Sequence, residues 1–125
     1  MTPQELLQDT IAYYSVNPAE RRCRSLYSCN YSPIKINKPL SEGCAIGRHL
    51  DEDVKIKFDN YYDIKSINFE YPDIFALAPQ WMQDMDIDFL QAIQNLHVYS
   101  DYWGETGLSE FGKERVDEIK EKFGL

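Results

Sequence analysis

The segment that follows Asp86 carries the strongest helical pattern in the chain, and it constrains the fold more than any other feature. Its apolar residues recur at intervals of three or four, which gathers them on one face of an α-helix. These residues are Phe89, Leu90, Ile93 and Leu96, with His97 at the margin of the stripe. Since Asp86 is a favourable N-cap, we expect a core helix over residues 86–100 with His97 facing inward.

Other helices have clear starting signals. Residues 2–5 (Thr-Pro-Gln-Glu) match a capping box with proline at the first helical position, and Asn17-Pro18 marks the end of that helix. Ser109 is a suitable N-cap for a last helix. A shorter helix is expected after Pro72. It should end before Pro79, because proline stops a helix.

Two segments in the middle of the chain, Val54–Phe58 and Ile67–Tyr71, alternate between apolar and other residues. This alternation is the period of a β-strand. Two shorter segments bounded by prolines, Cys29–Tyr31 and Ile34–Ile36, alternate in the same way. We therefore expect an α+β fold, in which a small antiparallel sheet or hairpins pack with about four helices in a single domain, residues 1–125.

The run Gly43-Cys44-Ala45-Ile46-Gly47-Arg48 is rich in small residues. Such residues let the backbone approach another segment or a ligand closely. A hairpin that brings Cys29 near Cys44 would place Tyr31 beside this run. We expect Gly47 to be required either by a positive φ or by a close contact, and we place the candidate site here.

Composition and charge exclude several classes of function. The 125 residues have a net charge of −8 and are 43% hydrophobic, a balance that is typical of a folded chain. The negative charge argues against a nucleic-acid partner, whose backbone is bound by Lys and Arg. The sequence contains no run of about 18 apolar residues, and its first residues lack the basic and apolar regions expected of a signal peptide. We expect a cytoplasmic protein with no membrane contact, in which the cysteines remain thiols.

Positive charge is concentrated at Arg21 and Arg22. A cluster of this kind usually forms a solvated or ion-paired surface. Together with Arg48, these residues can instead hold a phosphate or a carboxylate. The two alternatives differ for Arg48→Ala, which would cost stability in the first case and binding in the second. We favour the ion-paired role.

A metal site is considered because Cys29, Cys44, His49 and His97 offer two thiols and two imidazoles. These are the ligand types of a tetrahedral zinc ion. Structural zinc sites use pairs of ligands about two to four residues apart, and the chain has no Cys-x-x-Cys or His-x-x-x-His pair. We therefore expect no metal and no cofactor.

Cys44 and His97 are the candidates for catalysis. A thiol at the start of a helical turn is acidified by backbone N–H groups, and with His97 as base it would serve a hydrolase or a transferase. In the alternative interpretation Cys29 and Cys44 are buried as small apolar residues, and His97 is a core histidine that donates to a carbonyl or a tyrosine. We favour this structural role, because the chain carries no local signature of a cysteine hydrolase.

A series of short motifs is spread in order along most of the chain. They are Tyr13-Tyr14-Ser15, Arg21-Arg22, Cys29-x-Tyr31, Cys44-Ala45-Ile46-Gly47-Arg48-x-Leu50, Phe89-Leu90, Gln94-x-Leu96-His97 and Leu108-Ser109-Glu110-x-Gly112. In these motifs the chain resembles a group of small phage-encoded and prophage-encoded proteins. Members of that group tend to have an acidic residue after the histidine, where this chain has Val98. The group has no established activity, so the resemblance implies an origin and no mechanism.

These observations favour a non-enzymatic, acidic phage-type accessory protein that binds a host protein or a small ligand and blunts a host defence. The alternative is a cysteine-dependent hydrolase or transferase that uses Cys44 and His97. Tyrosine and tryptophan side chains suit a recognition surface. The expected binding residues are Arg21, Arg22, Cys29, Tyr31, Cys44, Gly47, Arg48, His97 and Trp103. No sequence feature specifies the number of copies.

Overall fold

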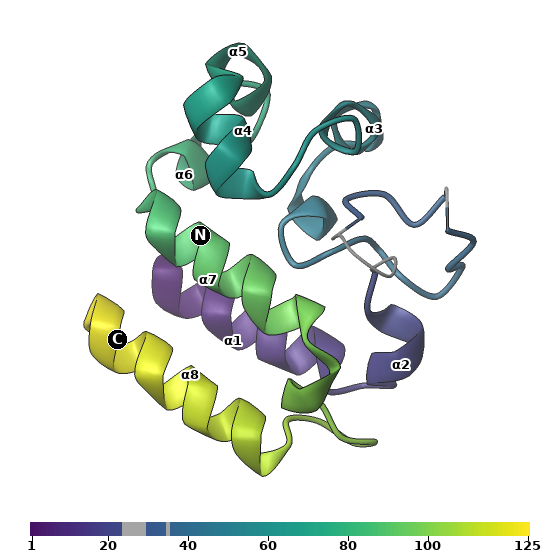
Figure 1. The fold of residues 1–125 in the computed structure, drawn as a ribbon, viewed down its shortest axis with the longest axis vertical. Helices are drawn as coiled ribbons and strands as arrows, with labels where there is room; N and C mark the ends of the chain where they lie inside the picture. Colours follow the sequence, from purple (N-terminus) through teal and green to yellow (C-terminus); the bar gives the residue numbers. More distant parts are fainter. Residues whose placement is uncertain (24–29, 35) are drawn as a thin grey trace.

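Three long helices lie side by side and form the frame of the protein (Figure 1). They are α1 (Pro3–Tyr14), α7 (Ile87–Val98) and α8 (Glu110–Phe123). Helices α1 and α7 run in the same direction, and α8 runs in the opposite direction. The computed structural model describes residues 1–23, 30–34 and 36–125.

The capping residues confirm these three predicted helices. Glu5 N–H donates to Thr2 Oγ1 at 3.2 Å, and Thr2 N–H donates to Glu5 Oε1 at 3.0 Å, which completes the capping box of α1. Asp86 accepts a hydrogen bond from the N–H of the second residue of α7 at 2.8 Å. Ser109 caps α8 in the same manner, accepting from the Gly112 N–H at 3.0 Å. The short N-cap side chains thus start each helix as expected.

Helix α7 lies at the centre of the fold. It packs against α1, α4 (Ile64–Glu70), α8 and the 3₁₀-helix η2 (Ser100–Tyr102). Its apolar stripe is buried as the sequence predicts, and so is His97. The buried apolar residues of the stripe are Phe89, Leu90, Ile93 and Leu96.

Two glutamines attach α4 to α7. Gln94 Oε1 accepts a hydrogen bond from the Ile64 N–H at 2.8 Å, and Gln91 Oε1 accepts one from the Lys65 N–H at 3.1 Å. N–H groups in the first turn of a helix have no partner within that helix. Side chains of α7 therefore cap α4, which gives the buried, polar Gln94 a structural role.

The predicted α+β fold is wrong. Val54–Phe58 lies in α3 (Glu52–Phe58), and Ile67–Tyr71 begins inside α4. Over the described residues the structure has eight α-helices, where about four were expected, and no β-strand. The β-type pairing that it does contain is an isolated bridge between Trp103 and Leu108. The described part of the chain is all-helical.

The burial pattern shows why the alternation was misleading. In a strand, Val54, Ile56 and Phe58 would share one face. In the structure Val54 and Phe58 are buried, but Ile56 is 47% exposed. Val54 and Phe58 are four residues apart, and residues at this spacing share one face of a helix. Helix α4 also has its own N-cap, since Asp63 Oδ1 accepts from the Ser66 N–H at 2.9 Å.

Residues 30–34 and 36–50 form turns and the 3₁₀-helix η1 (Gly47–His49), and no strand of the predicted hairpin occurs among these described residues. A backbone hydrogen bond from the Cys44 N–H to the Asn30 carbonyl, 3.0 Å long, still joins these two ranges. Cys29 and Lys35, which belong to the two predicted strand segments here, lie outside the described residues.

Three shorter helices complete the described part of the chain. They are α2 (Pro18–Arg21), α5 (Pro72–Phe75) and α6 (Gln80–Gln83). Helix α5 is the short helix that the sequence predicts after Pro72, and it ends before Pro79. Among the described residues, no helix combines the length and the apolar character that crossing a membrane requires.

Candidate functional site

The Gly43–Arg48 turn closes around the backbone of Tyr31. A Cβ atom added to Gly47 would lie 2.2 Å from the Tyr31 carbonyl oxygen, and one added to Gly43 would lie at the same distance. Gly43 also has a φ of +116°, which L side chains rarely adopt. The close contact expected at Gly47 is present, and its partner is backbone and not a ligand.

Tyr31 is held from three sides. Its N–H donates to Asp59 Oδ1 at 2.7 Å, its hydroxyl donates to the Tyr62 carbonyl at 2.9 Å, and its ring packs edge-on against Phe58. The side chain is almost completely buried. Asp59 was not singled out from the sequence, where Asp59-Asn60 has only the appearance of a turn.

Cys44 is fully buried and its sulfur has hydrogen-bond donors around it. The Gly47 N–H donates to Cys44 Sγ at 3.4 Å, and Gln94 Nε2 donates to it at 3.8 Å. The Cys44 carbonyl accepts from the Arg48 N–H at 3.0 Å, so the residue does begin a helical turn. The thiol acts as an interior acceptor, with no exposed surface at which a substrate would meet it.

His97 is also fully buried, and its ring packs against Tyr14 with centroids 4.9 Å apart. Its Nε2 accepts a hydrogen bond from the Cys23 N–H at 2.8 Å. In this contact the imidazole accepts, and the predicted donation from His97 to a carbonyl or a tyrosine is not tested by it. A ring nitrogen that accepts carries no proton, so this bond requires the neutral imidazole.

Arg22 and Trp103 bind the carboxyl end of α7. Arg22 Nε donates to the His97 carbonyl at 2.8 Å, Arg22 Nη2 donates to the Val98 carbonyl, and Trp103 Nε1 donates to the Leu96 carbonyl at 2.9 Å. The last carbonyls of a helix lack partners within the helix. Both side chains fill that need, and Trp103 is buried and not part of an exposed recognition surface.

Arg21 and Arg48 meet at Tyr13. Their guanidinium carbons lie 4.5 Å and 3.8 Å from the centroid of the Tyr13 ring. Arg48 Nη1 also pairs with Asp9 Oδ2 at 2.6 Å, and Arg48 Nε lies 3.5 Å from Glu42 Oε2. The Arg48 side chain is only 10% exposed and has two carboxylates beside it, as expected for the ion-paired role. Arg22 is not brought into this group, since it binds the end of α7.

His49 shares the carboxylate of Arg48. Its Nε2 lies 3.4 Å from Asp9 Oδ2, and its ring packs edge-on against Trp81 with centroids 5.5 Å apart. Burial lowers the pKa of His49, the charge of Arg48 lowers it further, and Asp9 opposes them. The neutral imidazole is therefore favoured in the folded protein.

The Cys23 thiol is a poor nucleophile at neutral pH. Burial raises the pKa of the Cys23 thiol to about 12, which keeps it protonated at neutral pH. Within residues 1–23, 30–34 and 36–125, no three His, Cys, Asp or Glu side chains are placed to share a metal ion. Cys29, a candidate binding residue and metal ligand, lies outside the described residues.

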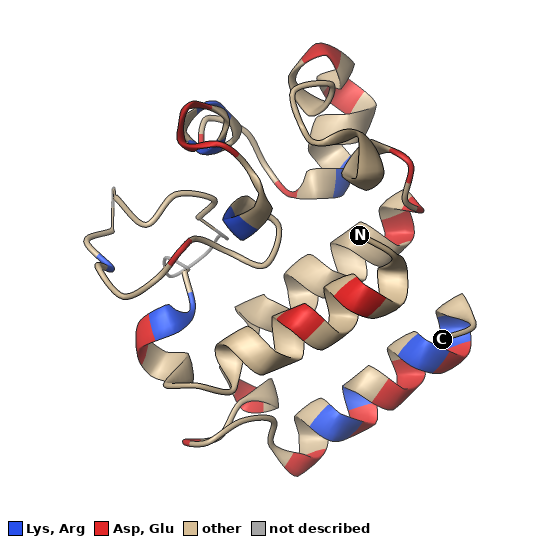
Figure 2. Ribbon diagram, turned by 180° about the vertical axis from the view of Figure 1, so that it is seen from behind, with Lys and Arg blue, Asp and Glu red and all other residues tan. Residues whose placement is uncertain are grey.

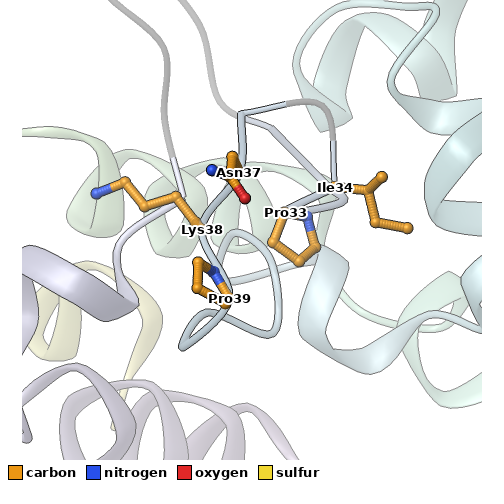
Figure 3. Close-up of a pocket in the computed structure, with 5 residues that line it drawn as sticks. All are labelled: Pro33, Ile34, Asn37, Lys38 and Pro39. Atoms are coloured by element: carbon orange, nitrogen blue, oxygen red, sulfur yellow. The ribbon is translucent and has the colours of Figure 1, made fainter.

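A pocket of about 290 Å³ lies in the loop that follows Ser32. Figure 3 shows its lining residues, which are Pro33, Ile34, Asn37, Lys38 and Pro39. The side chains of Ile34 and Lys38 extend away from each other, and Lys38 Nζ donates to the Ala19 carbonyl at 2.9 Å. The lining supplies no converging set of ionisable groups that would perform chemistry.

Three aromatic rings lie in series where η2 meets the start of α8, and the outer two are exposed while the middle one, Tyr102, is partly buried. Tyr102 lies between the other two rings, 5.7 Å from Tyr99 and 5.2 Å from Phe111 between centroids. Tyr99 is 54% exposed and Phe111 is 56% exposed. We call these three residues the aromatic surface. The sequence marks tyrosine side chains as suited to recognition, but no local pattern in it groups Tyr99 and Tyr102 with Phe111.

Acidic side chains lie close to the aromatic surface along the chain. Figure 2 shows acidic residues in η2, in the loop after it and at the start of α8. Between residues 99 and 114 the acidic residues are Asp101, Glu105, Glu110 and Glu114, and Lys113 is the one basic residue. This part of the chain is therefore both aromatic and negatively charged.

No family model, no curated protein and no solved structure matches this chain.

Proposed function

We propose that this chain is a non-enzymatic, phage-type interaction protein that acts in the host cytoplasm by binding a host protein or a small ligand and blunts a host defence. The observation that carries the proposal is the division between interior and surface. The side chains with catalytic potential, Cys44 and His97, are fully buried, whereas Tyr99 and Phe111 are more than half exposed.

The surroundings of Cys44 and His97 speak against the enzymatic alternative. A nucleophile must reach its substrate, and a general base needs a nitrogen that is available to accept a proton. The Cys44 sulfur is enclosed and accepts hydrogen bonds from Gly47 and Gln94. His97 Nε2 already accepts a hydrogen bond from Cys23. Both residues thus contribute to the stability of the fold.

The exposed surface supports a binding role. Large apolar side chains are usually buried, and a contiguous exposed group of them marks an interaction site. Tyrosine is among the residues that contribute most to binding at protein interfaces. The aromatic surface has two such rings, Tyr99 and Tyr102, beside Phe111. The net charge of −8 favours partners of positive charge.

The experiment immobilises the purified protein, captures components from a bacterial lysate and identifies them by mass spectrometry. Each captured component is then purified and titrated against the wild-type protein and against Cys44→Ser. Serine keeps an acceptor for the Gly47 N–H, and thermal unfolding checks that the variant is folded.

The proposal expects one saturable partner whose affinity is unchanged by Cys44→Ser. It also expects that phage growth on bacteria producing the protein is the same for the wild type and for this variant. A folded Cys44→Ser protein that has lost its effect on phage growth would contradict the proposal and favour the cysteine-dependent enzyme.

A further inference from the structure

The aromatic surface is prepared for binding by its rigid support. The Tyr102 carbonyl accepts from the Ser109 N–H at 2.9 Å, and Ser109 Oγ donates to the Asp101 carbonyl at 2.5 Å. A Cβ atom on Gly112 would lie 2.1 Å from the Tyr102 carbonyl oxygen, so glycine is what allows α8 to lie against η2. Because these contacts hold the backbone that carries the rings, a partner does not have to order this segment on binding.

The charges in this part of the chain favour a partner of positive charge. Of the four acidic residues between positions 99 and 114, Glu110 pairs with Lys113 at 3.1 Å. Asp101, Glu105 and Glu114 have no ion pair with any described residue. These carboxylates are available to pair with cations of a partner, and tyrosine faces attract Lys and Arg as well.

A second copy of the chain is a poor occupant of the same surface. In a two-fold symmetric dimer each aromatic surface would face its own copy. The unpaired carboxylates of Asp101, Glu105 and Glu114 would then lie close to the same carboxylates of the second copy. Like charges across an interface are unfavourable, so the charge pattern favours a partner that differs from this chain.

We propose that the aromatic surface, Tyr99, Tyr102 and Phe111, binds a basic peptide segment in which Lys or Arg alternates with apolar side chains. The apolar side chains cover the rings, and the cations pair with Asp101, Glu105 and Glu114. This inference rests on the proposed function and names the surface and the chemistry of the partner.

The test screens a displayed library of random peptides, each about 12 residues long, against the purified protein. Selected peptides are synthesised with a fluorescent label and titrated against the wild type, Phe111→Ser, Tyr99→Ser and Phe69→Ser. Phe69 is a matched control, because it is 84% exposed and lies in α4, at the other end of the molecule from the aromatic surface (Figure 1). Thermal unfolding confirms that each variant is folded.

We expect the selected peptides to be rich in Lys or Arg together with apolar residues. Phe111→Ser and Tyr99→Ser should each weaken binding about tenfold or more, and Phe69→Ser should change it less than about twofold. Raising NaCl from about 50 to about 500 mM should weaken wild-type binding severalfold, because the charge pairs are exposed.

Selected peptides without excess positive charge would overturn the inference, and so would equal losses in the Phe69→Ser and Phe111→Ser proteins. Sedimentation that shows a dimer abolished by Phe111→Ser would also overturn it, since a second copy would then occupy the surface. These outcomes are distinct from failure of the proposed function. If a partner from the lysate binds the Phe111→Ser protein as tightly as it binds the wild type, the proposed function stands. Only the assignment of binding to the aromatic surface would then be wrong.

Discussion

At the scale of single residues, the structure depends on places where a side chain is missing. The Tyr31 carbonyl lies close to the backbone of both Gly43 and Gly47. A Cβ atom added at either glycine would be 2.2 Å from the Tyr31 carbonyl oxygen. Contacts below 3.0 Å require a shift of the structure. Here the neighbouring atom is backbone, and moving it would disturb the hydrogen bonds of Tyr31 with Asp59 and Tyr62.

Gly47→Ala should therefore destabilise the protein by about 1–3 kcal/mol or prevent folding, the range for overpacking a closed interior. Gly104→Ala is the matched control, because a Cβ atom there meets its nearest neighbour at 3.6 Å, an ordinary contact. Urea unfolding of both variants measures the difference. Equal midpoints for the two variants would show that the turn does not close around Tyr31 as described.

His49 predicts a pH dependence of stability. Its pKa is lowered in the folded state, first by burial and then by Arg48, so the folded protein binds a proton there less readily than the unfolded chain. The stability that this residue contributes is fully present above the unfolded pKa of about 6.5 and is lost as the pH falls below it.

The free energy of unfolding should consequently fall between pH 7.5 and pH 5.5 by more in the wild type than in His49→Gln. Chemical denaturation at several pH values gives the two curves. His97 and all carboxylates are common to both proteins, so the difference between the curves isolates His49. Parallel curves would mean that His49 has the same proton affinity in the folded and unfolded states.

At the scale of elements, end signals determine helix formation in this chain more than short alternation does. Val54, Ile56 and Phe58 alternate as a strand would, yet α3 carries Glu52 and Asp53 in its first turn, where negative charge favours a helix. A run of five alternating residues fits the period of a strand or of a helix. The burial of Val54 and Phe58, which are four residues apart, identifies the helix.

Mutations in α3 show directly whether this segment is a helix or a strand. Phe58→Ala should cost about 3–5 kcal/mol, because the ring is fully buried. Ile56→Ser should stay within about 0.5 kcal/mol, because that side chain is on the exposed side of the helix. Denaturant unfolding supplies both values. Comparable losses at the two positions would place Ile56 and Phe58 on one buried face, as in a strand.

The predictable part of the fold is the part with strong local signals. The helices that begin after Thr2, Asp86 and Ser109 were predicted correctly, because each has an N-cap side chain and an apolar stripe. The helices α3 and α4 were missed because each spans only 7 residues, too few for a helical period to stand out.

For the candidate site, the sequence identified residues that do gather but did not predict what they bind. The contact of Gly47 with the Tyr31 segment was expected from the small residues. The role of Arg22 and Trp103 was not expected. Both donate to carbonyls at the end of α7, and which helix end a side chain reaches depends on the tertiary structure. The aromatic surface depends on the junction of η2 with α8, which no local pattern encodes.

At the scale of the whole molecule, the described residues include cysteines and a histidine that are buried, and aromatic rings and carboxylates that are exposed. Cys23, Cys44 and His97 are buried near the central helix α7 or belong to it, and each takes part in hydrogen bonds or packing that hold segments together. The exposed rings at Tyr99 and Phe111 have no such role in the interior. This division is what distinguishes an interaction protein from a thiol enzyme.

Thiol labelling of the native protein tests that division most directly. The protein is exposed to iodoacetamide over a range of urea concentrations, and peptide mass spectrometry follows Cys23 and Cys44 separately. Both should label about 10³-fold or more slower than in the unfolded chain, with a urea dependence that matches global unfolding. Labelling of Cys44 in the absence of urea at a rate near that of the unfolded chain would contradict the account, because it would reveal an open, reactive thiol.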